Sequence, residues 1–165
     1  MTSKARQKYL IVDPEVADLF DEAHEAVLEW RKATVRHIQT GLKVSESPSL
    51  QMSEGKVKVM LDILIKYTQP AGMDVARQRI DQIREVLGAA RPSSEAVMLF
   101  GRAIHHLPHD LMNRGMHNIV RNRTYKAMPT PAEWLAEVDE ALKWRLGLQK
   151  ALQDSGISSP EPKVA

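Results

Sequence analysis

The chain has 165 residues, of which 43% are hydrophobic and 27% are charged, with a formal net charge of +2. This length suits one domain with a single core, and the lack of cysteine excludes disulfides, Cys-ligated zinc, iron–sulfur clusters and thiol catalysis. No apolar run reaches the roughly 18 residues that a membrane span needs, and the N-terminal apolar patch is too short for a signal peptide. We therefore expect a cytoplasmic protein with no membrane partner.

The first strong pattern predicts a long amphipathic helix over residues 14–39. Asp13 and Pro14 are typical of a helix start, and Gly41 is typical of a helix end. Acids at its beginning and bases at its end complement the helix dipole. The seven acids that precede the first base are Asp13, Glu15, Asp18, Asp21, Glu22, Glu25 and Glu29.

The next segments alternate between loop and helix. Residues 42–53 have no periodicity and are rich in serine, so we expect a loop. Residues 54–68 fit either an alternating strand or a helical stripe, and their length favours a helix. Asp74 and Gly88 are typical ends for a helix over residues 75–87.

Three more helices complete the predicted set. The first is closed by Pro108, and the second is capped by Asp110. Gly115 weakens the second by about 1 kcal/mol relative to alanine, unless close packing uses it. The third opens at Thr130–Glu133, a capping box with proline in the first turn, and runs to about residue 153.

The sequence therefore predicts an all-α fold, a compact bundle of about six helices with a long N-terminal helix. We expect an N-terminal segment over residues 1–41 and a helical core domain over residues 54–153. The tail, residues 154–165, is rich in proline and serine and is predicted to be disordered.

Residue types that carry chemistry are sparse. His105 and His109 have the spacing of two metal ligands on one helix, but Pro108 lies between them and should end that helix. Asp21 and His24 have the spacing of ligands in di-iron bundles, which need a second copy that the chain lacks. Neither a phosphate-binding glycine loop nor a nucleophile elbow is present. We expect no cofactor, no metal and no enzymatic activity.

Residues 111–132 contain bases but no acid, and they form a candidate nucleic-acid interface. A cationic helix end beside an aromatic residue, here Tyr125, can hold phosphates and stack a base. The alternative is that these bases complement the dipole of their own helix. The candidate nucleic-acid-binding residues are Arg114, Arg121, Arg123 and Lys126.

The last helix offers candidate contacts for a protein partner. Trp144 falls opposite much of the apolar stripe Val138–Leu142, and exposed tryptophans are enriched at interface hot spots. Packing of Trp144 in the core is the alternative. Arg145 and Lys150 complete the candidate partner-binding set.

Five landmarks follow one another along the chain: the run Met60–Leu64, the break Pro70–Asp74, the helix VARQRIDQIREVLG, the Leu107-Pro108 joint and the cap Met128–Glu133. Over residues 57–140 their order resembles small helical phage proteins that load or inhibit the replicative hexameric helicase. The resemblance implies a compact helical domain acting by protein–protein contact, with its C-terminal region engaging a helicase that supplies the ATP chemistry. The long first helix and the extension over residues 142–153 depart from the family pattern.

We therefore expect a non-enzymatic accessory protein of phage or prophage DNA replication, with the helicase as its partner and single- or double-stranded DNA as a second candidate partner. One alternative is a DNA-binding regulatory protein that uses the helices around Leu107–Asp110 as a helix-turn-helix. Another is an inhibitor that docks on a host enzyme through the acidic helix 13–29.

Overall fold

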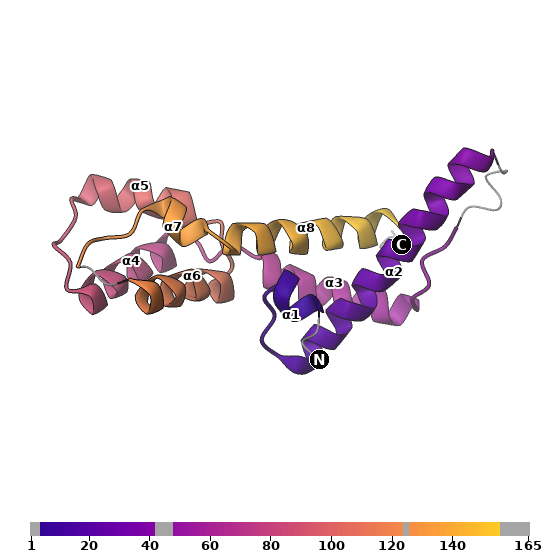
Figure 1. The fold of residues 1–165 in the computed structure, drawn as a ribbon, viewed down its shortest axis with the longest axis horizontal. Coiled ribbons are helices and arrows are strands. Elements are labelled where there is room, and N and C mark those ends of the chain that lie inside the picture. Colours follow the sequence, from indigo (N-terminus) through magenta and orange to yellow (C-terminus); the bar gives the residue numbers. More distant parts are fainter. Residues whose placement is uncertain (1–3, 42–47, 124–125, 156–165) are drawn as a thin grey trace, which may run out of the picture. The chain divides into compact units, whose positions relative to one another are not determined.

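The computed structural model describes residues 4–41, 48–123 and 126–155, and these ranges form eight helices and no strand (Figure 1). The all-α prediction is confirmed. None of the helices in these ranges is long and apolar enough to cross a membrane. Most of the tail predicted to be disordered lies outside the described residues.

The chain divides into two compact units. Unit 1 comprises Met1–Lys66 and Trp144–Ala165, and unit 2 comprises Tyr67–Lys143. This division differs from the predicted one at residues 1–41 and 54–153. The reason is that the later part of the last helix belongs with the N-terminal segment, to which Arg145 is hydrogen-bonded. Local sequence patterns do not predict such a long-range contact.

Unit 1 is built from α1 (Lys4–Lys8), α2 (Pro14–Thr40), most of α3 (Glu54–Thr68) and the later part of α8 (Val138–Asp154). The ends of α2 are as predicted. The Asp13 carboxylate accepts a hydrogen bond from the Glu15 amide at 3.0 Å, and Gly41 takes the left-handed conformation. The ambiguous segment before the second unit is a helix, α3, and the short α1 was not predicted.

The core of unit 1 follows the helical periodicity of the sequence. One side of α2 is buried, and its opposite side carries the acids. Each large apolar side chain buried in this way contributes about 1.5–3 kcal/mol. The buried hydrophobic residues of these helices are Ala17, Phe20, Ala23 and Val27 of α2, Val57, Met60 and Leu64 of α3, and Leu148, Ala151 and Leu152 of α8.

Unit 2 contains α4 (Met73–Leu87), α5 (Ser94–Ile104), α6 (His109–Asn122), α7 (Pro131–Leu135) and the first residues of α8. Two predicted caps are wrong, because α4 starts after Gly72 and α6 starts after Pro108. Asp74 and Asp110 instead lie in the first turns, where a carboxylate also stabilises the positive end of the helix dipole.

The predicted helix from Pro131 to about residue 153 is two helices. The chain breaks at Ala136 and Glu137, and Glu137 has a φ of +68°, a conformation that non-glycine residues rarely adopt. The break follows from the anchoring of α7. The buried Trp134 indole donates a hydrogen bond from Nε1 to the Met112 carbonyl at 3.1 Å, which holds α7 against α6 before α8 begins.

Gly115 makes this contact between α6 and α7 possible. A Cβ atom at this position would lie 2.5 Å from Trp134 Cδ1 and 2.8 Å from the Trp134 carbonyl oxygen. No real Cβ contact is that short, and a backbone carbonyl cannot swing aside as a flexible side chain can. The glycine in the middle of α6 therefore permits close packing, which is the alternative to a simple weakening of the helix that the sequence analysis gave.

We predict that Gly115→Ala destabilises the protein by about 1–3 kcal/mol, because overpacking against Trp134 outweighs the higher helix propensity of alanine. Gly147→Ala is the matched control. Gly147 also lies inside a helix, but an added Cβ meets nothing within 4 Å, so this variant should gain up to about 1 kcal/mol. Urea unfolding measures both values, and a Gly115→Ala protein as stable as the parent would contradict the packing described.

Candidate nucleic-acid interface and partner surfaces

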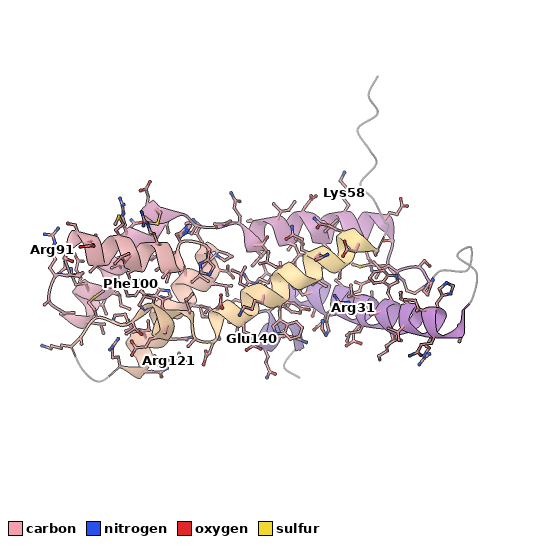
Figure 2. The ribbon with its side chains drawn as sticks, turned by 90° about the horizontal axis from the view of Figure 1, so that it is seen from above. Arg31, Lys58, Arg91, Phe100, Arg121 and Glu140 are labelled. Atoms are coloured by element: carbon pink, nitrogen blue, oxygen red, sulfur yellow. The ribbon has the colours of Figure 1, made fainter. Side chains whose placement is uncertain are left out.

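One side of α6 is buried in unit 2, and the other carries exposed bases. Arg114, His117 and Arg121 are exposed and are three or four residues apart, so they lie along one face of the helix; we call them the cation row. Arg121 is labelled in Figure 2. Arg114 and Arg121 are two turns apart, about 10 Å along the axis. Lys126, beyond the end of α6, is exposed too.

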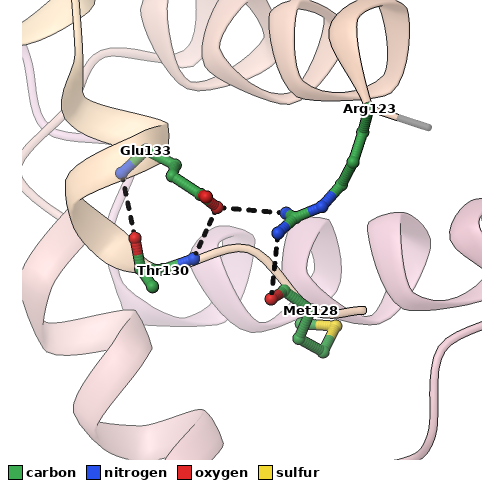
Figure 3. A network of polar contacts seen from close by, with 4 residues as sticks. All are labelled: Arg123, Met128, Thr130 and Glu133. Carbon is green, nitrogen blue, oxygen red and sulfur yellow. Dashed lines mark hydrogen bonds and ion pairs between the residues drawn. The ribbon is translucent and has the colours of Figure 1, made fainter. Parts of the chain in front are cut away.

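Arg123 differs from the other predicted nucleic-acid-binding residues, because its side chain is only 7% exposed. Its guanidinium donates a hydrogen bond to Glu133 Oε2 at 3.1 Å and another to the Met128 carbonyl at 3.5 Å (Figure 3). Arg123 therefore fastens the loop before α7 and does not present its charge to a phosphate. We correct its assignment from a binding residue to a structural one.

The same glutamate completes the predicted capping box, which is confirmed (Figure 3). The Thr130 amide donates to Glu133 Oε2 at 2.9 Å, and the Glu133 amide donates to Thr130 Oγ1 at 3.2 Å. One carboxylate thus holds both the start of α7 and the guanidinium at the end of α6. Tyr125, the predicted stacking residue, lies outside the described residues.

The position of the basic residues on α6 favours contact with DNA phosphates over recognition of the edges of the nucleobases. A recognition helix contacts base edges with its N-terminal residues. In α6 that first turn holds Asp110, an acid, followed by Leu111 and Met112, which are buried. The cation row begins only at Arg114, so it suits the sequence-independent part of DNA binding.

Two of the three predicted partner-binding residues are accessible on α8. Trp144 is 39% exposed, and the ammonium of Lys8 lies 3.5 Å from its ring centroid, a cation–π contact that covers part of the ring. Lys150 is largely exposed and forms an ion pair with Asp154 at 3.0 Å. These two residues stay candidates for a partner contact.

Arg145, the third, is completely buried, so it is not available to a partner. Its Nε donates a hydrogen bond to the Tyr9 carbonyl at 2.9 Å, and another guanidinium nitrogen donates to the Leu10 carbonyl at 3.3 Å. Arg145 thus ties α8 to the segment between α1 and α2, across more than 130 residues of sequence. Its place in the apolar stripe of α8, beside Leu142 and Leu148, is the signal that could have predicted its burial.

Tyr9, whose carbonyl accepts the hydrogen bond from Arg145, also makes a polar contact through its side chain. Its hydroxyl is 2.6 Å from His24 Nδ1, and its ring packs on Phe20 with centroids 5.1 Å apart. Burial is the main reason that the pKa of Tyr9 is raised to about 12, with Arg31 opposing and Asp21 adding to the shift. His24, which sequence spacing had paired with Asp21, therefore belongs to the packing of unit 1.

Three other histidines, His105, His106 and His109, lie between the end of α5 and the start of α6 in unit 2. His105 is the C-cap of α5 and His109 is the first residue of α6, so the two are on different helices. His106 Nε2 lies 3.5 Å from Asp139 Oδ1. Across the described residues, no group of three or more His, Asp or Glu side chains is placed to hold a metal ion.

Two hollows flank α6 within unit 2. One, of about 300 Å³, is bounded by Asn118 and Ile119 of α6 and by Glu133 and Glu137, and the Asn118 amide donates to Glu137 across it at 3.2 Å. The other, of about 470 Å³, lies between α4 and α6.

Comparison of the chain with protein-family models, curated proteins and solved structures finds no match. The function must therefore be inferred from the surfaces of the chain itself.

We predict that Arg145→Met destabilises the protein by about 2–4 kcal/mol, because two carbonyl groups lose their buried donor. Lys150→Met, which removes an exposed base from the same helix, should change stability by less than about 0.5 kcal/mol. Denaturant unfolding of both variants measures the difference. Equal stabilities would show that Arg145 does not hold α8 to the N-terminal segment.

A second prediction concerns alkaline pH. Tyr9 loses its proton near pH 10 when unfolded and near pH 12 when folded, so between these values the folded chain binds one more proton. Stability should then fall as pH rises, with a slope from Tyr9 of up to about 1.4 kcal/mol per pH unit. Tyr9→Phe should remove this part of the slope in unfolding experiments from pH 9 to 12. Parallel curves for the two proteins would contradict it.

Proposed function

We propose that this chain is a non-catalytic accessory protein of phage or prophage DNA replication that binds the replicative hexameric helicase, as a loader or an inhibitor. The observation that carries the proposal is that two separate landmarks of the resemblance, the break Pro70–Asp74 and the Leu107-Pro108 joint, lie side by side in unit 2. The Ala71 amide, in the break after α3, donates to the Leu107 carbonyl at 2.9 Å. The next amide, Gly72, donates to the His105 carbonyl at 3.1 Å.

The last landmark, the cap Met128–Glu133, also contributes contacts that hold unit 2 together. Pro129 is buried, Thr130 and Glu133 form the capping box, and Trp134 follows directly and packs on α6. Positions that recur in the family pattern thus coincide with contacts that hold one compact helical unit together. That coincidence supports a body whose helices are fixed so that their outer faces can bind another protein.

DNA is the second partner in this proposal, through Arg114, Arg121 and Lys126. Three phosphate contacts give weak binding that falls steeply with salt, because affinity depends on the counterions released. Such binding suits a protein that is brought to DNA by its helicase and then steadies the strand. It does not suit a regulator that must find one site by itself.

A second candidate function comes from the outer side of α2. Five exposed carboxylates follow one another there at spacings of three and four residues, over about 21 Å of helix. Two of them already contact lysines, Glu22 with Lys56 at 2.6 Å and Glu29 with Lys32 at 3.1 Å. Such a row could dock on the basic nucleic-acid site of a host enzyme. Its members are Glu15, Asp18, Glu22, Glu25 and Glu29.

We predict that the helicase of the same host is retained by the immobilised full-length chain. The acid row supplies the variant that separates the two candidates, since Asp18→Lys with Glu25→Lys should leave helicase retention unchanged. Loss of retention in that variant would favour docking through α2, and no retention by the parent chain would contradict the main proposal.

We predict for DNA that Arg114→Glu with Arg121→Glu weakens binding at least about 10-fold at low salt, because repulsion replaces two phosphate contacts. The matched control is Arg91→Glu with Arg102→Glu, two exposed arginines of unit 2 outside α6 that change the net charge equally. Fluorescence anisotropy with a labelled oligonucleotide measures both. Equal loss in the control would mean that net charge, and not the cation row, binds DNA.

A further inference from the structure

The groove between α4 and α6 has an apolar floor that unit 2 itself does not cover. Val86 of α4 is 65% exposed and Val120 of α6 is 38% exposed, and both line the hollow of about 470 Å³ together with Met116. The neighbouring isoleucines of the same helices, Ile83 and Ile119, are buried. The valines therefore lie on the outer side of the two helices, around one hollow.

The two walls of this groove are held at a fixed distance. Arg79 of α4 donates from Nε to Asn113 Oδ1 at 2.6 Å and from another guanidinium nitrogen to Gln82 Oε1 at 3.0 Å. At the other end, a Cβ on Gly88 would lie 3.9 Å from the Lys126 side chain. Just before the two helices, the Ala71 amide donates to the Leu107 carbonyl at 2.9 Å. The starts of α4 and α6 therefore lie together, as do their ends, so the helices run in the same direction.

The walls also carry opposite charges. Glu85, the one acid on the α4 side of this groove, has a side chain that is 71% exposed and lies 3.6 Å from the less exposed guanidinium of Arg84. His117 and Arg121, on the α6 side, are exposed across the groove from it. An apolar floor between an acidic wall and a basic wall is self-complementary, because each wall fits the opposite wall of an identical groove.

We propose that this groove is the contact through which two copies of the chain associate, with α4 of each copy against α6 of the other. Charge selects the geometry. If the two-fold axis runs along the helices, Glu85 of one copy meets His117 and Arg121 of its partner, and the valines meet at the centre. If the axis runs across the helices, α4 meets α4 and the acids face each other, which costs free energy.

This inference goes beyond the proposed function and does not depend on the identity of the helicase or on DNA. Arg121 lines the groove and also belongs to the DNA proposal, whereas Arg114 and Lys126 do not line the groove. Glu85, Val86 and Val120 line it but belong to no DNA contact proposed above. Variants at these positions therefore test self-association separately.

The test is sedimentation velocity of the full-length chain from about 1 to 200 μM. We expect a monomer–dimer equilibrium, weakened at least about 10-fold by Val120→Glu, which puts a charge at the apolar centre. Leu99→Glu is the matched control, since Leu99 is 55% exposed on α5 of the same unit and lies outside the groove. A chain that stays monomeric up to 200 μM, or a control that weakens dimers equally, overturns the proposal.

A charge exchange then tests the pairing of the walls. Glu85→Arg alone and Arg121→Glu alone should each weaken the dimer, because like charges then face each other across the contact. The double variant restores opposite charges, so it should recover most of the parent affinity. Both residues are exposed, and circular dichroism confirms that the single variants keep their helices. Failure of the double variant to recover affinity would overturn the proposed geometry.

Discussion

The contact between Trp134 and Gly115 is the constraint on which the architecture of unit 2 depends. A buried indole lies against the backbone of α6 at a place where even one methyl group does not fit, and its N–H donates a hydrogen bond to the Met112 carbonyl. The contact fixes which side of α6 faces inward. As a consequence, the cation row and the wall of the α4–α6 groove both face outward, and the chain must turn at Glu137 before α8 begins.

Unit 1 depends on a different kind of tie. The guanidinium of Arg145 is buried and donates hydrogen bonds to two main-chain carbonyls of the segment between α1 and α2. A buried charge is costly unless its donors are used, and here they order a stretch in which Leu10 has a positive φ. Each unit thus contains one buried side chain that donates hydrogen bonds to main-chain carbonyls of a distant segment, Arg145 in unit 1 and Trp134 in unit 2.

The sequence predicted what is local and missed what is long-range. The ends of α2 and the capping box at Thr130 could be predicted, because each rests on residues within four positions of one another. The predictions for Arg123 and Arg145 are wrong because the sequence shows their charge but not the acceptors that hold them inside, the Glu133 carboxylate for Arg123 and two main-chain carbonyls for Arg145. The break at Glu137 was missed for the same reason: nothing in residues 131–153 records that Trp134 is held by α6. The cation row could be predicted only in part. The spacing of Arg114, His117 and Arg121 is local, but the contact with Trp134 that directs this face outward is long-range.

We propose that α6, held by Trp134, presents its cation row to DNA, and the function of unit 2 depends on this surface. Hydrogen–deuterium exchange of the full-length chain, alone and with an oligonucleotide at low salt, tests this proposal most directly. We predict that amides of α6 exchange more slowly in the complex, while those of α5, in the same unit, exchange at an unchanged rate. Slower exchange confined to α2 or α5, or no change in any peptide, would contradict it.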